Sequence, residues 1–387
     1  TRARYARTRL DREPVMEVFQ HKGSSECING LGSVLSAEDE LCNIEQVRVL
    51  GETAAVSRFR LQGSELLLDP PENITVTDCG DDTGTMGMLA GGCVSKNDFL
   101  RSALLTGLDE QLSIGLNPVK MGVIASTDGH AGTPGKVEED AWKGTVTGEM
   151  APTERLIAGT LPSGIKGNPG GLAGVWAQEN SRDSIFDALR RREVFGTSGP
   201  RITPRMFGGW SLAEDLCEAN DMIEQADAQA VPMGGDLHTD ETPPQQGKPR
   251  FLLAAQRDLG GLQTPLQRLQ LIKGWVDNGG HHIDIRTVAG SADSDAGVNV
   301  QTGERFGDGH DSLCTVVEDN DFNPLLPAYY YMRVVENPSP RWSLFDCLSL
   351  AESERPAVCS DQQRHIIQEM AWTSPIWYTP GAKQAGR

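Results

Sequence analysis

Asp128 and His130 offer the most specific chemistry in the sequence. They follow an apolar run at 121–125 that is bounded by Pro118 and Gly129, a pattern that predicts a short buried strand. In α/β barrels, the residues just beyond the C-terminal end of a strand line the active site. A carboxylate oxygen and an imidazole nitrogen in this position suit a Zn, Mn or Fe ion. The spacing therefore predicts a metal site, with ordinary Asp-Gly turn chemistry as the alternative.

Two glutamates and an arginine are the other candidate site residues. Glu17 lies on a predicted strand and would face the same barrel end as Asp128 if that strand belongs to the barrel. Glu26, in a Gly-Ser-Ser-Glu turn, would either reach the site or stay in solvent. Arg201 suits a bidentate grip on phosphate, sulfate or carboxylate, or a salt bridge at a domain junction.

Two histidines lie near predicted strand ends. His21 has the donor atoms to bind a metal, but an isolated histidine of this kind is more often structural. His238 sits in a Gly-Asp-Leu-His-Thr segment that resembles a metal-binding strand end, but the neighbouring prolines favour a loop, and we leave it outside the site. No serine-hydrolase, P-loop or dinucleotide-binding motif is present, which argues against those classes.

The composition is that of a large folded protein with many loops. The 387 residues are 38% hydrophobic and 23% charged, and they include 43 glycines and 22 prolines. A net charge of −19 argues against nucleic-acid partners, which need a basic surface. No apolar run reaches the roughly 18 residues that would span a bilayer.

The cysteines give information about the compartment. None of the eight forms a Cys-x-x-Cys pair, which argues against a thiolate zinc site. Local pairs such as Cys79 with Cys93, and Cys347 with Cys359, would close short loops and fit an oxidising compartment. We therefore expect a periplasmic or secreted protein, with eight reduced and mostly buried thiols as the alternative.

The order of predicted elements indicates an α/β part followed by a β part. Leu100, Leu104 and Leu108 recur at helical spacing before the strand at 121–125, although Gly107 would end this helix early. Such alternation is typical of a parallel sheet or barrel. Strand-like segments without intervening helices, which suggest a β-sandwich, occur at 251–255, 269–272, 282–288 and 329–335.

We therefore expect a partial barrel at residues 1–200, with an insertion at about 28–92, and a β-sandwich-like domain at residues 201–387.

Seven motifs are distributed along the chain: GSSEC at 23–27, IASTDGH at 124–130, GNPGGL at 167–172, WAQENSR at 176–182, TSGPRI at 197–202, LIKGWVD at 271–277 and TSPIWY at 373–378. Together they resemble one bacterial family, the domain of unknown function 3604 group. That family is similar to the PHP (polymerase and histidinol phosphatase) metal-dependent hydrolases, which use a distorted β/α barrel. The resemblance covers nearly the whole chain.

The resemblance implies roles for several residues. Asp128 and His130 correspond to the last metal-binding motif, and Glu17 would lie beside the metal cluster. The opening His-x-His motif is expected before Thr1, so this chain would be a C-terminal fragment. It would supply part of a site for two or three divalent transition-metal ions (Zn, Mn or Fe).

We therefore expect a PHP-type hydrolase that acts on a small anionic phosphoester or related ester. Asp128 and His130 would bind metal, while Glu17 or Glu26 would orient a ligand or the attacking water. Arg201 would hold an anionic group of the substrate. The alternative is a non-catalytic exported protein whose β-sandwich binds a glycan or a protein partner.

Overall fold

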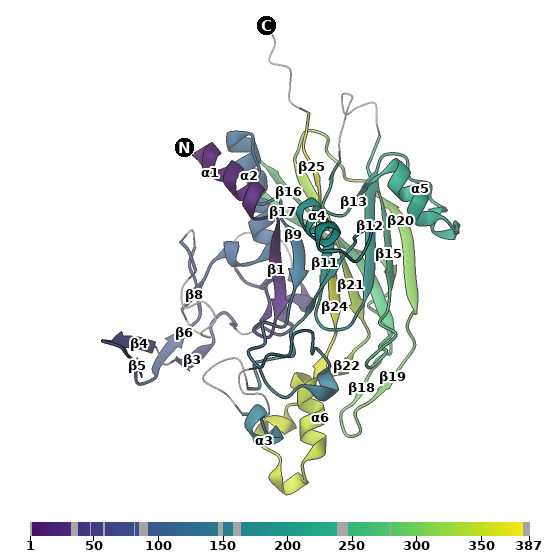
Figure 1. The fold of residues 1–387 in the computed structure, drawn as a ribbon. Helices are drawn as coiled ribbons and strands as arrows, with labels where there is room; N and C mark the ends of the chain where they lie inside the picture. The colour runs from purple at the N-terminus through teal and green to yellow at the C-terminus, as the bar shows by residue number, and fades with distance from the viewer. Residues whose placement is uncertain are drawn as a thin grey trace.

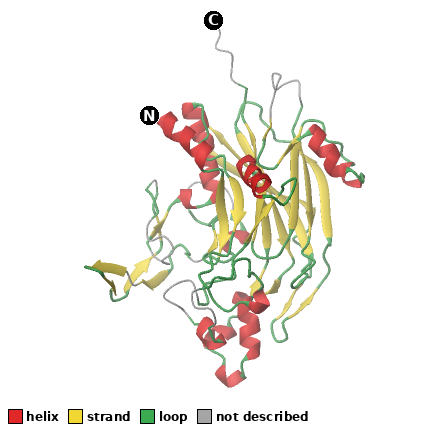
Figure 2. Ribbon diagram, viewed as in Figure 1, coloured by secondary structure: helices red, strands yellow, loops and turns green. Residues whose placement is uncertain are grey.

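Sheets dominate the fold. The computed structural model describes residues 2–31, 38–46, 48–56, 59–80, 82–84, 92–145, 150–157, 164–237, 247–278 and 280–381. Within these residues, six α-helices surround a mostly β body (Figures 1 and 2), and the strands form no closed barrel. None of the described helices has the length and apolar character needed to span a bilayer.

The largest sheet stands at the centre of the molecule. Its main path runs β10, β11, β24, β21, β16, β17, and it also contains β14 and β25. The bounds are β10 (Leu172–Val175), β11 (Val194–Thr197), β14 (Asp236–Leu237), β16 (Leu266–Asp277), β17 (Gly280–Gly290), β21 (Ala328–Glu336), β24 (Met370–Thr373) and β25 (Ile376–Tyr378). Every residue of β21 is buried because both faces of this sheet are covered.

A second antiparallel sheet packs against one face of the central sheet. It runs β13 (Val231–Pro232), β12 (Thr203–Gly209), β15 (Arg250–Gln256), β20 (Ser312–Glu318). Successive residues of β21 point to opposite faces. Tyr330 and Met332 therefore enter the core shared with the second sheet, whereas Tyr329 and Tyr331 enter the core on the other side. This is the layering that a β-sandwich requires.

The other face of the central sheet is covered by α2 (Leu100–Ile114) and by a small sheet. The small sheet runs β2 (Gly23–Ser24), β1 (Val15–Gln20), β9 (Gly122–Ala125), and β1 and β9 are parallel. Helix α2 continues through Gly107, against the prediction, and ends at Gly115 in the left-handed conformation. Gly107 is a packing residue, because a Cβ there would lie 2.3 Å from Oδ1 of Asn117.

The PHP-like barrel is not formed by the described residues. β1 and β9 are parallel as a barrel requires, but β10 and β11 are antiparallel although α4 (Arg182–Arg191) connects them. β11 then pairs with β24, so segments from both sides of residue 200 share one sheet. The division into two domains at residue 200 stays a prediction. The strands predicted beyond residue 200 are confirmed as β15, β16, β17 and β21.

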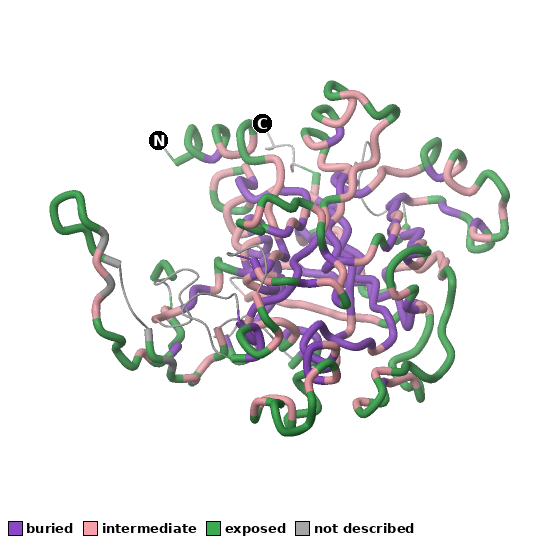
Figure 3. The backbone as a smooth tube through the Cα atoms, turned by 60° about the horizontal axis from the view of Figure 1, so that its bottom comes forward, coloured by how far each residue is buried: buried purple, intermediate pink, exposed green. Residues whose placement is uncertain are grey.

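The remaining elements lie around this body. The helices are α1 (Arg2–Arg12), α3 (Pro152–Arg155), α5 (Met222–Gln229) and α6 (Trp342–Ser349). The two-stranded sheets pair β3 (Thr53–Val56) with β6 (Glu72–Thr75), β4 (Phe59–Gln62) with β5 (Glu65–Leu68), β7 (Thr77–Asp78) with β8 (Cys93–Val94), β18 (Gly297–Asn299) with β19 (Glu304–Phe306), and β22 (Ser339–Pro340) with β23 (Ile366–Ile367). The sheets within the expected insertion project from the body (Figure 1), and much of this projection is exposed (Figure 3).

All eight cysteines form disulfides. The bonds join Cys27 to Cys42, Cys79 to Cys93, Cys217 to Cys314, and Cys347 to Cys359. The two local pairs suggested by the sequence are therefore confirmed.

A buried network of four charged residues joins α2 to the central sheet. Arg101 lies 2.6 Å from Glu26 and 2.7 Å from Asp39, and Arg333 lies 3.1 Å and 3.0 Å from the same two carboxylates. The side chains of all four are at most 3% exposed. Burial alone would raise the pKa of Glu26, but the positive charges of Arg333 and Arg101 outweigh it and hold that pKa below its usual value.

We expect Glu26→Gln to lower the free energy of unfolding by about 3–5 kcal/mol, since it leaves buried arginines short of one negative charge. Glu13→Gln is the matched control, because Glu13 pairs with Arg9 at 2.7 Å on the surface. That pair should contribute at most about 0.5 kcal/mol. Urea denaturation of the two variants measures both values, and equal losses would contradict a special role for the network.

Candidate metal centre

The parallel pairing of β1 and β9 brings two strand ends to the same edge. Glu17 lies opposite Ile124 and Phe19 opposite Ala125, so the residues that follow each strand emerge side by side. The backbone N–H of His21 donates to the carbonyl of Thr127 at 3.2 Å. This register places His21 beside the Asp-Gly-His turn that the sequence singled out.

His21, Asp128 and His130 form a cluster in which one potential ligand atom of each lies within 4.8 Å of the others. Nε2 of His21 is 3.4 Å from Oδ2 of Asp128, and the two imidazole rings lie 5.6 Å apart. His21 is buried at 2% exposure, whereas the Asp128 side chain is 38% exposed. The cluster thus has a fixed inner donor and an outer side open to solvent.

The hydrogen bond of His130 determines its tautomer. Nδ1 lies 2.8 Å from the backbone carbonyl oxygen of Asp128. A carbonyl only accepts, so Nδ1 carries a proton, and in the neutral ring Nε2 then has the free lone pair. A backbone carbonyl bound to one ring nitrogen is the usual partner of a histidine whose other nitrogen binds metal.

The ammonium group of Lys22 already lies against the donors of this cluster. It contacts Oδ2 of Asp128, and it lies 3.0 Å from Nε2 of His21 and 2.9 Å from Oε1 of Gln20. An ammonium group only donates, so Nε2 of His21 accepts and directs its lone pair toward a cation. Burial lowers the pKa of Lys22, and the negative charge of Glu17 opposes this effect. The donors present therefore fit a positive ion.

The GNPGGL segment supports this edge from behind. The side-chain amide of Asn168 donates to the carbonyl of His21 at 3.3 Å and accepts from the backbone N–H of Gly170 at 2.7 Å. Gly170 has φ +83°, and a Cβ there would lie 2.6 Å from Cα of Thr127. Asp128 itself has φ +47°, a strained conformation that packed surroundings must maintain and that is often found at functional sites.

Glu17 lies next to the cluster but contributes no ligand atom to it. Its Oε1 accepts from the hydroxyl of Ser126, and its Oε2 lies 3.4 Å from the amide nitrogen of Gln20. Glu17, Gln20, Lys22 and Arg48 line a polar cavity of about 280 Å³ beside the cluster. Glu17 thus faces the space next to the candidate ligands.

The other predicted site residues lie elsewhere. Glu26 belongs to the buried network, where Tyr331 and Trp372 also donate to it at 2.6 Å and 2.7 Å, so it does not face the cavity. Arg201 is exposed and lines a different cavity. His238 lies outside the described residues. From the sequence, His21 has the donor atoms of a ligand but is not assigned to the site. Asn168 belongs to the GNPGGL motif, which gives it no role in the site, and no sequence signal points to Lys22.

One other group among the described residues has potential metal ligands within the same distance. It consists of Cys27, Asp39 and Cys42, but the two cysteines form a disulfide and Asp39 belongs to the buried network. The cluster around Asp128 is therefore the better candidate for a transition metal.

Comparisons with known proteins identify the family. A family model described as "Protein of unknown function (DUF3604)" matches residues 1–63 and 81–380. The unmatched segment between them falls within the small sheets that project from the body. Neither the curated proteins nor the solved structures contain a match. Since the match covers most of the chain and includes every residue of the cluster, the chain belongs to the DUF3604 family.

Proposed function

We propose that this protein is a metal-dependent hydrolase whose metal ion binds to His21, Asp128 and His130. The observation that supports the proposal is the meeting of their ligand atoms within 4.8 Å at an edge where two parallel strands end. Two imidazoles and one carboxylate suit Zn, Mn or Fe. Three protein ligands also leave a coordination position for water, as in catalytic metal sites.

A bound ion would lower the pKa of a water ligand from about 15.7 toward about 7 and would polarise an ester oxygen. The side chains of the protein would orient the metal ligands and bind the substrate. The Asp128 carbonyl fixes the His130 ring, and Lys22 and Arg48 bring positive charge to the adjoining cavity. Glu17, on the wall of that cavity, would accept a proton from the attacking water.

The same cavity supports a proposal for the substrate class. The polar space of about 280 Å³ is lined by Lys22 and Arg48 and by the acids Glu17 and Asp98, and Arg48 pairs with Asp98 at 3.4 Å. Its size suits a small polar compound, and we propose a phosphoester or a related ester whose anionic group would contact Lys22. A PHP-type site with two or three ions is the finer form of this proposal. In that form, the family's His-x-His motif would add further donors to the three residues described.

We also propose that the protein is exported to the periplasm or secreted. The support is that all eight cysteines are paired, since disulfides persist in oxidising compartments.

Asp128→Asn should abolish metal-dependent ester hydrolysis and leave the fold largely intact, since this side chain is 38% exposed and lies outside the packed cores.

Elemental mass spectrometry of the purified protein measures the metal directly. We expect at least one transition-metal equivalent in the wild type and less in His21→Ala and His130→Ala. Unchanged turnover in Asp128→Asn would rule out the mechanism, and a metal-free wild type would rule out the centre.

Lys22→Met should bind Zn²⁺ or Mn²⁺ about tenfold more tightly than the wild type, equal to about 1.4 kcal/mol, because the competing ammonium is gone. Its hydrolysis of an anionic ester should nevertheless be slower. Lys248→Met is the control, since that lysine bonds Asn320 on the exposed surface of the second sheet. Isothermal titration calorimetry gives the affinities, and weaker metal binding in Lys22→Met would show that the lysine supports the ion.

A further inference from the structure

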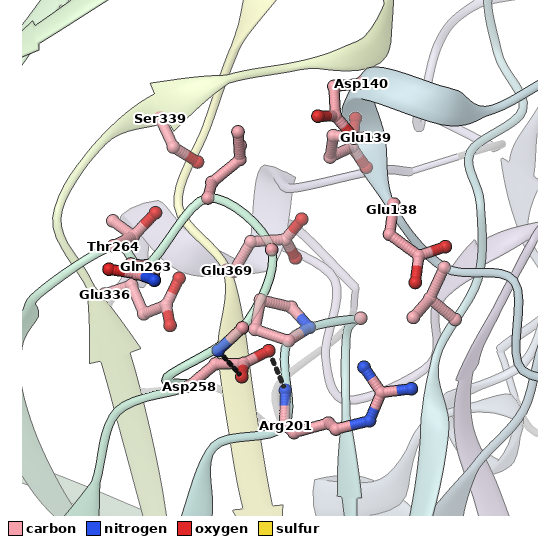
Figure 4. A pocket seen from close by; sticks show the side chains of 16 residues that line it. Glu138, Glu139, Asp140, Arg201, Asp258, Gln263, Thr264, Glu336, Ser339 and Glu369 are labelled. Atoms are coloured by element: carbon pink, nitrogen blue, oxygen red, sulfur yellow. Dashed lines mark hydrogen bonds between the residues drawn. The ribbon is translucent and has the colours of Figure 1, made fainter.

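A second cavity, of about 40 Å³, lies where β21 ends and β24 begins (Figure 4). Its volume suits a few water molecules or one partly hydrated ion. Six carboxylic acids and one arginine are among its lining residues: Glu138, Glu139, Asp140, Asp258, Glu336, Glu369 and Arg201. This cavity is distinct from the space beside the metal cluster, with which it shares no lining residue.

Glu336 is the unusual residue of this cavity. Its side chain is fully buried, at 0% exposure, and neither carboxylate oxygen has a hydrogen-bond partner among the described residues. Burial and then the negative charge of Asp258 raise the pKa of Glu336 well above its usual value, although Arg305 and Arg257 act in the opposite direction. A buried polar group without a partner is costly and calls for a ligand, an ion or water that would complete it.

Glu369 and Asp258 complete one side of the cavity. Glu369 is a neighbour of Glu336 across the ends of the two strands, because the N–H of Glu336 donates to its carbonyl at 2.9 Å. Asp258 accepts from the backbone N–H groups of Arg201 at 2.8 Å and Gly260 at 2.7 Å, which orients its carboxylate. Figure 4 shows the three carboxyl groups around the same part of the cavity.

The remaining donors are also oxygens. The amide of Gln263 and the hydroxyls of Thr264 and Ser339 line the cavity, and no histidine, cysteine or methionine is among its lining residues, all of which the structure describes. Calcium takes six to eight oxygen ligands at about 2.3–2.6 Å, whereas zinc and iron prefer sites with nitrogen or sulfur. The donor set therefore selects for a hard cation.

We propose that this cavity is a binding site for a hard divalent cation, with calcium as the preferred ion and Glu336 and Glu369 as its principal ligands. Among the described residues, the three carboxylates are not a group with ligand atoms all within 4.8 Å of one another. The ion would therefore draw them inward and complete its shell with Gln263 and water. This proposal is independent of the transition metal proposed at His21.

Glu336→Gln tests the proposal, because it keeps the shape of the side chain and removes its charge. Titration calorimetry of the wild type with CaCl₂ should show one bound ion, and calcium should raise the Tm relative to EDTA. In Glu336→Gln, we expect affinity to fall at least tenfold and the calcium-dependent rise in Tm to disappear. The Tm in EDTA should stay equal or increase, since a buried carboxylate is gone, so loss of binding cannot be mistaken for unfolding.

Asp140→Asn is the matched control. This residue is an exposed acid on the same cavity, and its variant should change calcium affinity less than threefold. His130→Ala should also bind calcium normally, which separates this cavity from the other centre.

The proposal is overturned if millimolar Ca²⁺, Mg²⁺ and Mn²⁺ all fail to bind the wild type. Three other results would also overturn it: Glu336→Gln keeps its calcium affinity, His130→Ala loses calcium binding, or the cavity binds methylammonium, an organic monovalent cation, instead of calcium.

Proton release gives a second readout. Burial raises the pKa of Glu369 to about 8, against the opposing effect of the hydrogen bond from Ser198. Glu336 raises the pKa of Glu369, and the other groups that influence these two acids are Ser198, Glu45, Glu139, Arg341, Asp258, Arg305 and Arg257. Calcium binding at pH 7 should therefore release protons, which calorimetry in buffers of different ionisation enthalpy detects. Equal proton release in Glu369→Gln and in the wild type would contradict the assignment of Glu369 as a ligand.

The same pKa gives a pH dependence without calcium. Between the usual pKa of a glutamate, about 4.3, and about 8, folded Glu369 binds a proton that the unfolded chain has lost. The free energy of unfolding in EDTA should therefore fall as the pH rises through this range. Urea denaturation at pH 5, 6.5 and 8 should show a smaller fall for Glu369→Gln than for the wild type, and equal slopes would contradict the assignment.

Discussion

The buried pairing of two carboxylates with two guanidinium groups is the constraint on which the rest of the structure depends. Arg101 lies on α2 and Arg333 on the central sheet, while Glu26 and Asp39 come from the segment after β1. No partner can move away without leaving an uncompensated charge in the core. The network therefore fixes the chain just beyond His21, and the backbone N–H of Arg101 donates to the carbonyl of Glu26 at 3.2 Å to complete the attachment.

The two candidate ion sites differ in their donor atoms and in their place in the fold. The cluster at His21 combines nitrogen and oxygen at the edge of a small parallel sheet and is open to solvent. The cavity at Glu336 offers only oxygen and lies at the end of the central sheet. Under the two proposals, the ion at His21 would take part in catalysis and the ion at Glu336 would neutralise acids that the sheet buries.

Local sequence patterns predict part of this structure, whereas the rest depends on pairing between segments that lie far apart in the sequence. The apolar run before Asp128, the leucine spacing of α2 and the alternating strands beyond residue 250 could be predicted because each depends on near neighbours in the sequence. The third member of the cluster could not, since His21 reaches Asp128 only through the parallel register of β1 with β9. The pairing of β11 with β24, and the complete burial of Glu26 among arginines distant in the sequence, likewise have no local signal.

Lys22 gives the cluster at Asp128 a positive charge of its own. Loading a divalent ion there would be an exchange of cations, in which the charge of the site rises by one unit instead of two. Since a neutral amine competes less than an ammonium group, and burial already favours the neutral form, alkaline conditions would ease the exchange. The lysine would thus act as a tethered counterion, which holds the cluster together until a divalent ion takes its place.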